Sequence, residues 1–548
     1  MAADLSDMRE QIAAALAAER ELFSTDQPDE PPSSSFVRAC LYNNERGDGI
    51  LFARLHRGKF IQVKNWGKAG VWLQWCGHHW RIDKKDAVRN AVEEVAQVYL
   101  AEAMHTKARR DEIDKKTERQ AWEAANEEHK LYMARVRKLR SVAGAKNCLE
   151  WSTTIGEDDK LAIISDEIDL HPWLLACRNG VIDLRTGKFS PGRPDDYLLR
   201  AVPIDWQGID ATCPRWDAFI DEIHQHDKEI IAYLDRLFGY TLTGLTTHHF
   251  VGLFLGEGRN GKGTMFETLR WILGDLAWNI SPELLIEQKN ARNSAGPSPD
   301  LISMQGRRMI IASESDDNRR ISGQQVKRLT GADTIVARAP HDRDETNITP
   351  TWKLFFYTNN IPKGMAADFA LSERLVYLVY PLKFVTNPDP SDPMQRQQDP
   401  ELPAQLKKEG PGILARYVRG CLAFQEAGGL FPPPSIRTAV ADLQRSEDTI
   451  RQFVEEVDDS EPPIRVNVEP IVHPERPDLL DHEVKVSFKS LYSLFCSWYA
   501  DNISESDKYR PSKKAVSAWL EKHGFRRSKP CGIAHVHGIR LRVREGAV

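Results

Sequence analysis

The nine residues from Gly256 to Thr264 read Gly-Glu-Gly-Arg-Asn-Gly-Lys-Gly-Thr and contain the pattern G-x-x-x-x-G-K. Glycines in such a loop let successive backbone N–H groups turn inward and form a nest for anionic oxygens. The lysine can reach the β- and γ-phosphates of a nucleoside triphosphate. The pattern therefore predicts an ATP site, whose binding residues are Gly256, Gly258, Asn260, Gly261, Lys262, Gly263 and Thr264.

The residue after the lysine departs from the usual phosphate-binding loop. A serine or threonine hydroxyl normally ligates Mg²⁺ at this position, but here Gly263 stands there and Thr264 follows it. Either Thr264 supplies the hydroxyl from a shifted loop, or water replaces it. Thr264 is therefore a predicted Mg²⁺ ligand, together with the downstream acid Glu314.

Three polar residues follow the loop in an order that suits ATP hydrolysis. Glu314 ends the apolar run 308–313 and would polarise the attacking water, directly or through Mg²⁺. Asn359 ends the apolar run 352–358 and would hydrogen-bond the γ-phosphate or the water. Arg374 would place a fixed positive charge on the transition state in a neighbouring subunit. The predicted catalytic residues are thus Lys262, Glu314, Asn359 and Arg374.

Each of the three downstream residues also has a purely structural interpretation. Glu314 can be the ordinary acidic end of a buried strand, and Asn359 can belong to a turn before a proline. Arg374 can form a surface salt bridge with the adjacent Glu373. The order of all three after a phosphate-binding loop favours the catalytic interpretation.

The elements that must position these residues can be predicted from periodicity. Residues 250–255 form an apolar run typical of a buried strand, and residues 264–273 have helical spacing before Gly274. Strand, glycine loop and helix in this order are the context that a phosphate-binding loop requires. Residues 246–385 continue with alternating strand and helix patterns, which predicts a nucleotide-binding α/β domain.

The composition of the whole chain is that of a multidomain globular protein without a membrane span. The chain has 548 residues, 41% hydrophobic and 28% charged, with a net charge of −5, so two to four domains are expected. The apolar runs are too short to cross a bilayer, and the N-terminus lacks the features of a signal peptide. None of the eight cysteines forms C-x-x-C, which indicates free thiols in the cytoplasm rather than a zinc ribbon.

Five units are predicted along the chain. Residues 1–95 form an accessory domain with a helix at 8–23 and strands at 60–63 and 71–75, and residues 96–245 hold charged helices and a helical domain. The ATPase domain, residues 246–385, is followed by a helical connector and Pro-rich linker at 386–483 and by an end domain at 484–548.

The end domain has the element order of a winged helix. Helices are predicted at 488–500 and 512–524, and two strands of a wing at 525–529 and 534–542. This domain is locally basic in an acidic chain, which suits contact with DNA phosphates, although a solvated charged face is an equal alternative for any one residue. The predicted DNA contacts are Lys513, Lys514, Arg526 and Lys529.

Taken together, these motifs resemble the series found in superfamily 3 helicases. The surrounding sequence is similar to the phage and plasmid primase–helicase family, which is related to the poxvirus primase–helicase. The resemblance covers roughly residues 145–546. Its motifs are specific in combination, although each motif alone is weak. The segments that carry it are 179–187, 213–216, 256–262, 327–338, 409–414 and 429–432.

The resemblance implies an AAA+-like ATPase core in a homo-oligomeric, hexameric ring, with ATP and Mg²⁺ at the subunit interfaces. Single-stranded DNA would pass through the ring, and forked DNA would be unwound from 3′ to 5′. It also implies a β-hairpin with arms at 334–338 and 347–349 that touches DNA, with Lys327, His341 and Arg343 as candidate contacts. Two aspartates beside Arg343 make a self-neutralised hairpin turn the alternative.

Relatives in this family often carry a primase, but this sequence has neither a zinc-binding cysteine set nor an Asp-x-Asp pair at its N-terminus. We therefore expect helicase without primase activity, with a separate primase or other replication proteins as partners, in the cytoplasm of a bacterial host. Two other classes compete: an ATP-dependent initiator, loader or protein remodeller, and a small-molecule P-loop kinase. Stimulation of the ATPase by single-stranded DNA would separate the helicase from the first class. The order from Asn359 to Arg374 and the predicted winged helix argue against the kinase.

Overall fold

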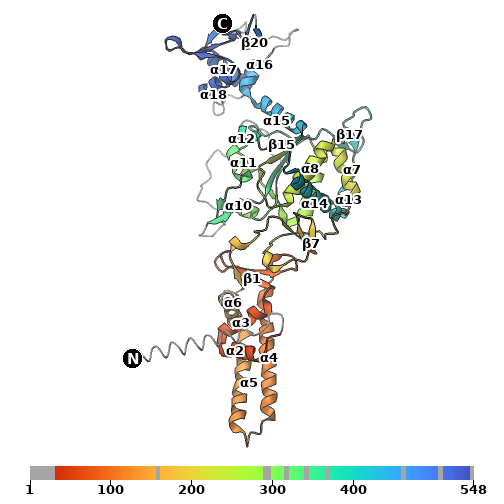
Figure 1. The fold of residues 1–548 in the computed structure, drawn as a ribbon, viewed down its shortest axis with the longest axis vertical. Helices are drawn as coiled ribbons and strands as arrows, with labels where there is room; N and C mark the ends of the chain where they lie inside the picture. The colour runs from red at the N-terminus through yellow and green to blue at the C-terminus, as the bar shows by residue number, and fades with distance from the viewer. Residues whose placement is uncertain are drawn as a thin grey trace.

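The computed structural model describes residues 31–155, 161–287, 298–313, 320–338, 345–365, 369–457, 465–474, 476–503 and 510–542. The molecule is elongated, with an N-terminal helical hairpin at one end, a parallel sheet in the middle and the C-terminal unit at the other end (Figure 1). Within these ranges, no helix combines the length and apolarity needed to cross a membrane.

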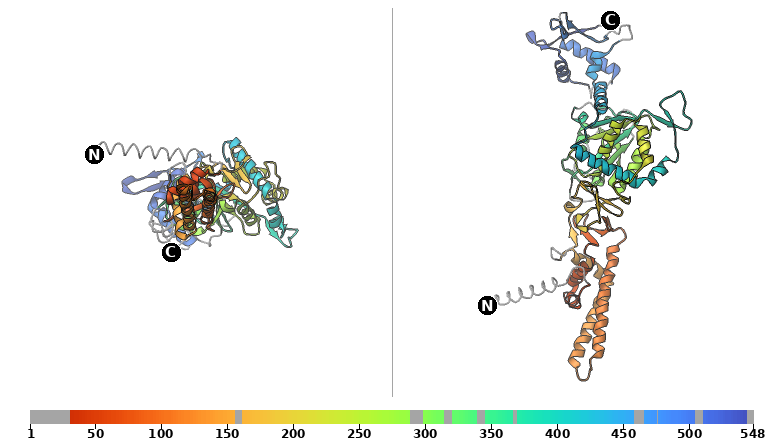
Figure 2. Two further views of the ribbon diagram at one scale, coloured as in Figure 1. Left: turned by 90° about the horizontal axis from the view of Figure 1, so that it is seen from below. Right: turned by 45° about the vertical axis from the view of Figure 1, so that its right-hand side comes forward.

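In the described part of the N-terminal unit, five helices surround one core. The helices are α2 (Ser34–Tyr42), α3 (Asn44–His56), α4 (Ala87–Glu112), α5 (Arg119–Leu139) and α6 (Val142–Ser152). Helices α4 and α5 lie side by side as a long hairpin that projects from the body (Figures 1 and 2). Buried residues from all five helices share this core, among them Cys40, Phe52, Tyr99, Tyr132 and Cys148.

This core corrects the predicted boundary at residue 95. The boundary falls inside α4, whose buried residues Val92, Val95 and Tyr99 lie on both sides of it. A helix whose apolar stripe packs continuously on its neighbours cannot be divided between two domains. The predicted helix at 8–23 lies outside the described residues.

Two small four-stranded sheets connect the helical unit to the middle of the molecule. The first has the order β3-β2-β1-β4 and the second β7-β6-β5-β8. The strands predicted at 60–63 and 71–75 are confirmed as β1 and β2. The bounds are β1 (Phe60–Val63), β2 (Val71–Trp75), β3 (Trp80–Ile82), β4 (Ala162–Ile163), β5 (Leu174–Cys177), β6 (Gly180–Asp183), β7 (Lys188–Ser190) and β8 (Ala201–Val202).

The central sheet has five parallel strands in the order β10-β11-β14-β9-β15. Each strand is an apolar run because parallel sheets are covered by helices on both faces. The prediction of a multidomain α/β chain is confirmed. The bounds are β9 (Val251–Leu255), β10 (Ala277–Ile280), β11 (Met309–Ser313), β14 (Lys353–Thr358) and β15 (Leu375–Val379).

Alternate residues of the sheet enter two different cores. Phe254, Ile311 and Phe355 pack with helices α7 (Pro214–Ile223), α8 (Lys228–Leu242), α9 (Lys262–Leu273) and α14 (Gly410–Ala427). Leu253, Ile310 and Phe356 pack with α10 (Pro299–Met304), α11 (Gly323–Thr330) and α15 (Pro434–Glu447). The period-2 alternation of a strand sends neighbouring side chains to opposite faces.

The predicted boundary at residue 245 is therefore also corrected. Helices α7 and α8 precede it, yet Trp216, Leu237 and Phe238 belong to the same core as the sheet residue Phe355. The rings of Phe238 and Phe355 stack with centroids 5.6 Å apart. These helices cover one face of the sheet and do not form a separate domain.

The C-terminal unit begins earlier than predicted. Its core contains Ile450 and Phe453 of α16 (Thr449–Glu455) and Val468 of β18 (Val468–Pro470), so the boundary at residue 484 is corrected to a point near residue 448. The remaining core comes from α17 (Phe488–Asn502), α18 (Lys513–Lys522) and a sheet of order β21-β23-β22, with β21 (Lys485–Ser487), β22 (Arg527–Ser528) and β23 (His535–His537).

The two helices predicted in this unit are confirmed, but the predicted second wing strand is divided. Gly538 has φ +82°, a left-handed conformation that glycine adopts without steric cost. It separates β23, which pairs with β21 and β22, from β24 (Ile539–Leu541), which pairs with β18.

The other described elements are shorter or peripheral. They are α12 (Phe369–Ser372), α13 (Leu402–Lys408), β16 (Lys383–Val385), β17 (Gln395–Gln397), β19 (Val472–His473), β20 (Arg476–Leu480), η1 (Ser165–Glu167), η2 (Pro194–Asp196), η3 (Gly274–Leu276), η4 (Pro282–Leu284) and η6 (Pro530–Gly532).

Candidate functional site

The glycine loop joins the carboxyl end of β9 to the amino end of α9. Gly258 and Gly261 have φ of +95° and +87°, and Arg259 between them has φ +51°. Gly261 is also fixed by packing, because a Cβ atom there would lie 2.6 Å from Cγ2 of Ile223 in α7. Helix α9 starts directly at Lys262, so its unpaired N–H groups and positive dipole end lie at the loop, where an anion is favoured.

Lys262 is folded into this loop and is only 3% exposed. Its Nζ donates to the carbonyl oxygen of Gly256 at 2.7 Å and to Oδ1 of Asn260 at 3.1 Å. Burial lowers the pKa of Lys262 to about 8 because desolvation disfavours the charged ammonium. An anionic ligand at this position would supply the missing counter-charge.

Asn260 links Lys262 to the end of the sheet through hydrogen bonds. Its Nδ2 donates to the carbonyl oxygen of Tyr380, just after β15, at 3.4 Å. The hydroxyl of Tyr380 in turn hydrogen-bonds Nε2 of His224 at 2.9 Å. Sequence reasoning missed Tyr380 and His224, because they lie far from the loop along the chain and no motif marks them.

Gly263 and Thr264 lie at the first turn of α9 and open onto a cavity of about 680 Å³ beside that helix. A Cβ atom at Gly263 would meet nothing within 4 Å, so the missing hydroxyl at this position has no steric cause. Thr264 stays a predicted Mg²⁺ ligand. Among the described residues, no group of three or more His, Cys, Asp or Glu side chains could hold a metal ion.

Asn359 lies at the same edge of the sheet as the loop. Strand β14 pairs with β9 so that Thr358 is opposite Leu255, and the backbone N–H of Gly256 donates to the carbonyl oxygen of Thr358 at 3.2 Å. Asn359 follows directly and is exposed. Strand β11 ends at Ser313 on the same edge, next to β14; Glu314 itself lies outside the described residues.

Arg374 lies at the opposite edge of the sheet. It immediately precedes β15, and its carbonyl oxygen accepts from the N–H of Val251, the first residue of β9. The loop follows the last residue of that five-residue strand, so about 16 Å of strand separates the two positions. The structure therefore does not bring Arg374 to the Lys262 loop of the same chain.

The side chain of Arg374 binds helix α11 instead. Its Nη1 donates to the carbonyl oxygen of Lys327 and to Oγ1 of Thr330, both at 3.0 Å. No ion pair between Arg374 and Glu373 occurs in the part of the chain that the structure describes, so the salt-bridge alternative is not formed.

Helix α11 leads into the predicted hairpin. Strands β12 (Ile335–Ala337) and β13 (Thr346–Ile348) pair antiparallel, which confirms its two arms. The tip residues His341 and Arg343 lie outside the described residues. Lys327 is on α11, half-buried, beside this hairpin.

The predicted C-terminal contacts are all exposed. Lys513 and Lys514 occupy the first turn of α18, and Arg526 and Lys529 flank β22. Two lysines at the positive end of a helix dipole are unfavourable for the helix itself.

Comparisons with known proteins give two family matches. Residues 49–225 match the family described as D5 N terminal like, and residues 254–374 match a family of unknown function. A candidate helicase of Acanthamoeba polyphaga mimivirus is 24% identical over 415 residues, which cover 73% of this chain and 42% of that protein. A candidate helicase of Frog virus 3 is 25% identical, covering 53% of this chain and 37% of that protein.

A candidate primase of African swine fever virus is 22% identical, covering 53% of this chain and 31% of that protein. The chain thus spans about two fifths or less of the length of these curated relatives. The solved apo structure of the NrS-1 C terminal region covers 60% of this chain with 11% identity and a TM-score of 0.37, a likeness too weak to support an argument about fold.

Proposed function

From the confirmed resemblance of this chain to the phage and viral primase–helicase family, we propose that it is an ATP-driven DNA helicase of superfamily 3. Its relatives are named as candidate helicases and a candidate primase. In this proposal, the central sheet is an AAA+-like ATPase core that moves along single-stranded DNA from 3′ to 5′ as a homo-oligomeric ring, a hexamer by family resemblance.

One observation carries the proposal furthest. Lys262 and Asn359 both lie at the carboxyl ends of the strands, whereas Arg374 lies about 16 Å away at their amino ends. A triphosphate held by Lys262 therefore receives no help from Arg374 of the same chain. A second copy of the chain would have to supply that arginine, which supports an ATP site between subunits.

The loop residues have distinct roles in this proposal. Backbone N–H groups from Gly256 to Gly261 bind the phosphates, and Lys262 exchanges its internal bonds to Gly256 and Asn260 for the γ-phosphate. Asn359 orients the attacking water, and Glu314 polarises it. Thr264 and Glu314 would hold Mg²⁺, which offsets negative charge on the triphosphate.

Two regions would contact the DNA. The β12–β13 hairpin, with Lys327, His341 and Arg343 as candidate contacts, would follow the strand in the ring. The C-terminal unit, proposed as a winged helix, would bind duplex or forked DNA through Lys513, Lys514, Arg526 and Lys529. A separate primase or other replication proteins are proposed partners.

A strand-displacement assay with forked DNA of both polarities, with ATP hydrolysis measured alongside, tests the proposal. We expect unwinding of the fork with a 3′ loading strand and an ATPase that single-stranded DNA stimulates. A DNA-stimulated ATPase without displacement would favour the initiator or loader class. If DNA does not change the rate of ATP hydrolysis and no strand is displaced, the helicase proposal is wrong.

A further inference from the structure

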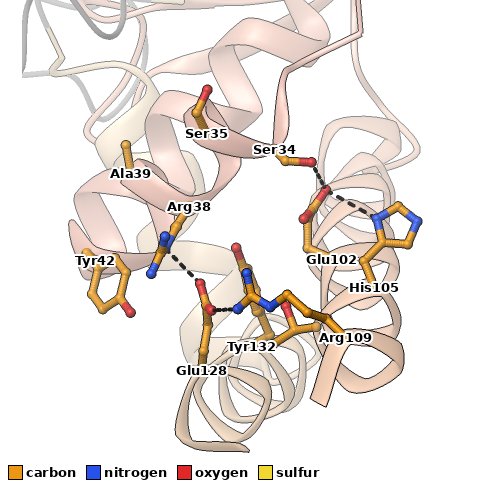
Figure 3. A pocket seen from close by; sticks show the side chains of 11 residues that line it. Ser34, Ser35, Arg38, Ala39, Tyr42, Glu102, His105, Arg109, Glu128 and Tyr132 are labelled. Atoms are coloured by element: carbon orange, nitrogen blue, oxygen red, sulfur yellow. Dashed lines mark hydrogen bonds and ion pairs between the residues drawn. The ribbon is translucent and has the colours of Figure 1, made fainter. Parts of the chain in front are cut away.

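A second polar cavity, of about 700 Å³, lies in the N-terminal helical unit between α2, α4 and α5 (Figure 3). It is separate from the glycine loop and from the candidate site residues described above. Its size is within the range of small-molecule sites in proteins. The side chains that face it are polar or charged on all three helices, which distinguishes it from a packing defect.

The charges in the cavity are organised by one buried carboxylate. The side chain of Glu128 on α5 is 7% exposed, and its two oxygens each accept from one arginine at 2.7 Å: Oε1 from Nε of Arg38 and Oε2 from Nη2 of Arg109 (Figure 3). The arginine side chains are 55% and 57% exposed. Glu128 thus fixes two guanidinium groups whose side chains are more than half exposed, so their other N–H groups can donate to a ligand.

The other carboxylate in the cavity is already bonded. Glu102 on α4 accepts from the hydroxyl of Ser34 at 2.8 Å and lies 3.9 Å from Nδ1 of His105. A cation in this cavity would have to compete with two arginines for Glu128 and with Ser34 for Glu102.

A buried donor also faces the cavity. Tyr132 is 1% exposed and lines the cavity. Burial raises the pKa of this phenol, so the hydroxyl stays protonated and can donate. The first turn of the nine-residue helix α2 lies at the same cavity through Ser34 and Ser35, and its dipole adds a positive potential.

We propose that this cavity binds a phosphate group, either as inorganic phosphate or as the terminal phosphate of a nucleic-acid strand. Planar guanidinium groups bind phosphate oxygens in pairs of hydrogen bonds, and Glu128 holds one from α2 and one from α4. Tyr132 supplies a further donor from the floor of the cavity. The exposed ring of Tyr42 at the rim, 56% exposed, offers a base a surface to stack on.

The test uses the full chain carrying Lys262→Ala, so that the glycine loop contributes no phosphate binding. Calorimetry measures the affinity for inorganic phosphate, and fluorescence anisotropy compares a 5′-phosphorylated with a 5′-hydroxyl oligonucleotide. We expect Arg109→Met and Tyr132→Phe each to weaken phosphate binding about tenfold, as loss of a hydrogen bond to a charged group does. The matched control is Arg119→Met, on α5 outside the cavity, where the arginine pairs with exposed Glu123.

The two oligonucleotide arms separate the sources. A preference for the 5′-phosphorylated strand that Tyr132→Phe abolishes assigns the site to strand ends, and binding of inorganic phosphate alone assigns it to the free anion. No phosphate binding, or equal affinities in the two cavity variants and the control, overturns the proposal. If Arg109→Met unfolds, the Tyr132→Phe comparison decides, because that variant keeps the buried ring.

Discussion

At the scale of the residue, Lys262 is a buried cation whose hydrogen-bond partners are neutral, so the site favours an anionic ligand. Its ammonium is buried among a carbonyl and an amide oxygen, and burial holds its pKa at about 8, below the usual lysine value. Binding of a phosphate favours the charged form and raises that pKa. Nucleotide affinity and proton binding at this residue should therefore be linked.

The link has a definite sign. Below pH 8 the free protein already carries the charged lysine, whereas above pH 8 binding must first protonate it. We expect the ATP affinity to fall about tenfold between pH 7 and pH 9, with net proton uptake at the higher pH. Calorimetry in buffers of different ionisation enthalpy measures both quantities.

The test variant is Lys262→Ala, which should lose ATP hydrolysis and most of this pH dependence. The matched control is Lys408→Ala, because Lys408 is an exposed lysine on α13. The control should keep both ATP hydrolysis and the pH dependence. An unchanged pH dependence in Lys262→Ala would assign the titration to another group.

Two glycines of the same loop should respond in opposite ways to a side chain. A Cβ atom at Gly263 meets nothing within 4 Å, whereas one at Gly261 clashes with Ile223 and would sit at φ +87°. We expect Gly263→Ser to leave the melting temperature unchanged and Gly261→Ala to cost about 1–3 kcal/mol of stability. A retained ATPase in Gly263→Ser would show that a hydroxyl is tolerated at the position where such loops usually carry one.

At the scale of the element, β9, the loop and α9 could be predicted because the apolar run, the glycines and the helical spacing are all local signals. The strands before Asn359 and Glu314 could be predicted for the same reason. The packing of α7 on Gly261 could not be predicted, because no sequence feature of Ile223 or Phe219 indicates a contact with the loop. The predicted domain boundary at residue 245 was wrong for a related reason. In the sequence α7 and α8 resemble an independent helical pair, because the sequence does not show the sheet that they cover.

The structure also explains two segments that carried the family resemblance separately. The carboxylate of Glu409, at the start of α14, accepts from the backbone N–H groups of Arg215 and Trp216, at 3.0 and 2.9 Å. These are first-turn residues of α7, so α14 supplies the N-terminal cap that α7 lacks in its own sequence. Segments 213–216 and 409–414 are one contact in space.

Removal of this cap should destabilise the packing of α7 on the central sheet. We expect Glu409→Ala to lower the free energy of unfolding by about 1–2 kcal/mol, the usual cost of losing an N-terminal cap, and Glu409→Gln to lower it by less. Denaturant unfolding measures both. Because α7 packs on Gly261, the alanine variant should also bind nucleotide more weakly; an unchanged nucleotide affinity would mean that α7 does not support the loop.

At the scale of the whole molecule, the chain is elongated and the proposed ATP site lies in its middle part (Figure 1). The helical hairpin of α4 and α5 extends to one end and the C-terminal unit to the other (Figures 1 and 2). Lys262 and Arg374 lie at opposite edges of the sheet between them, so one chain presents two incomplete halves of the proposed ATP site.

Complementation between variants tests whether two chains complete it. Lys262→Ala and Arg374→Ala should each lose ATP turnover, the second with nucleotide binding retained because Arg374 does not touch its own loop. In a ring assembled at random from equal amounts of both, about a quarter of the interfaces pair an intact lysine with an intact arginine. ATPase activity should then reappear in the mixture and should depend on subunit exchange. Mixed subunits that exchange yet stay inactive, or an Arg374→Ala variant with normal turnover, would exclude the shared site.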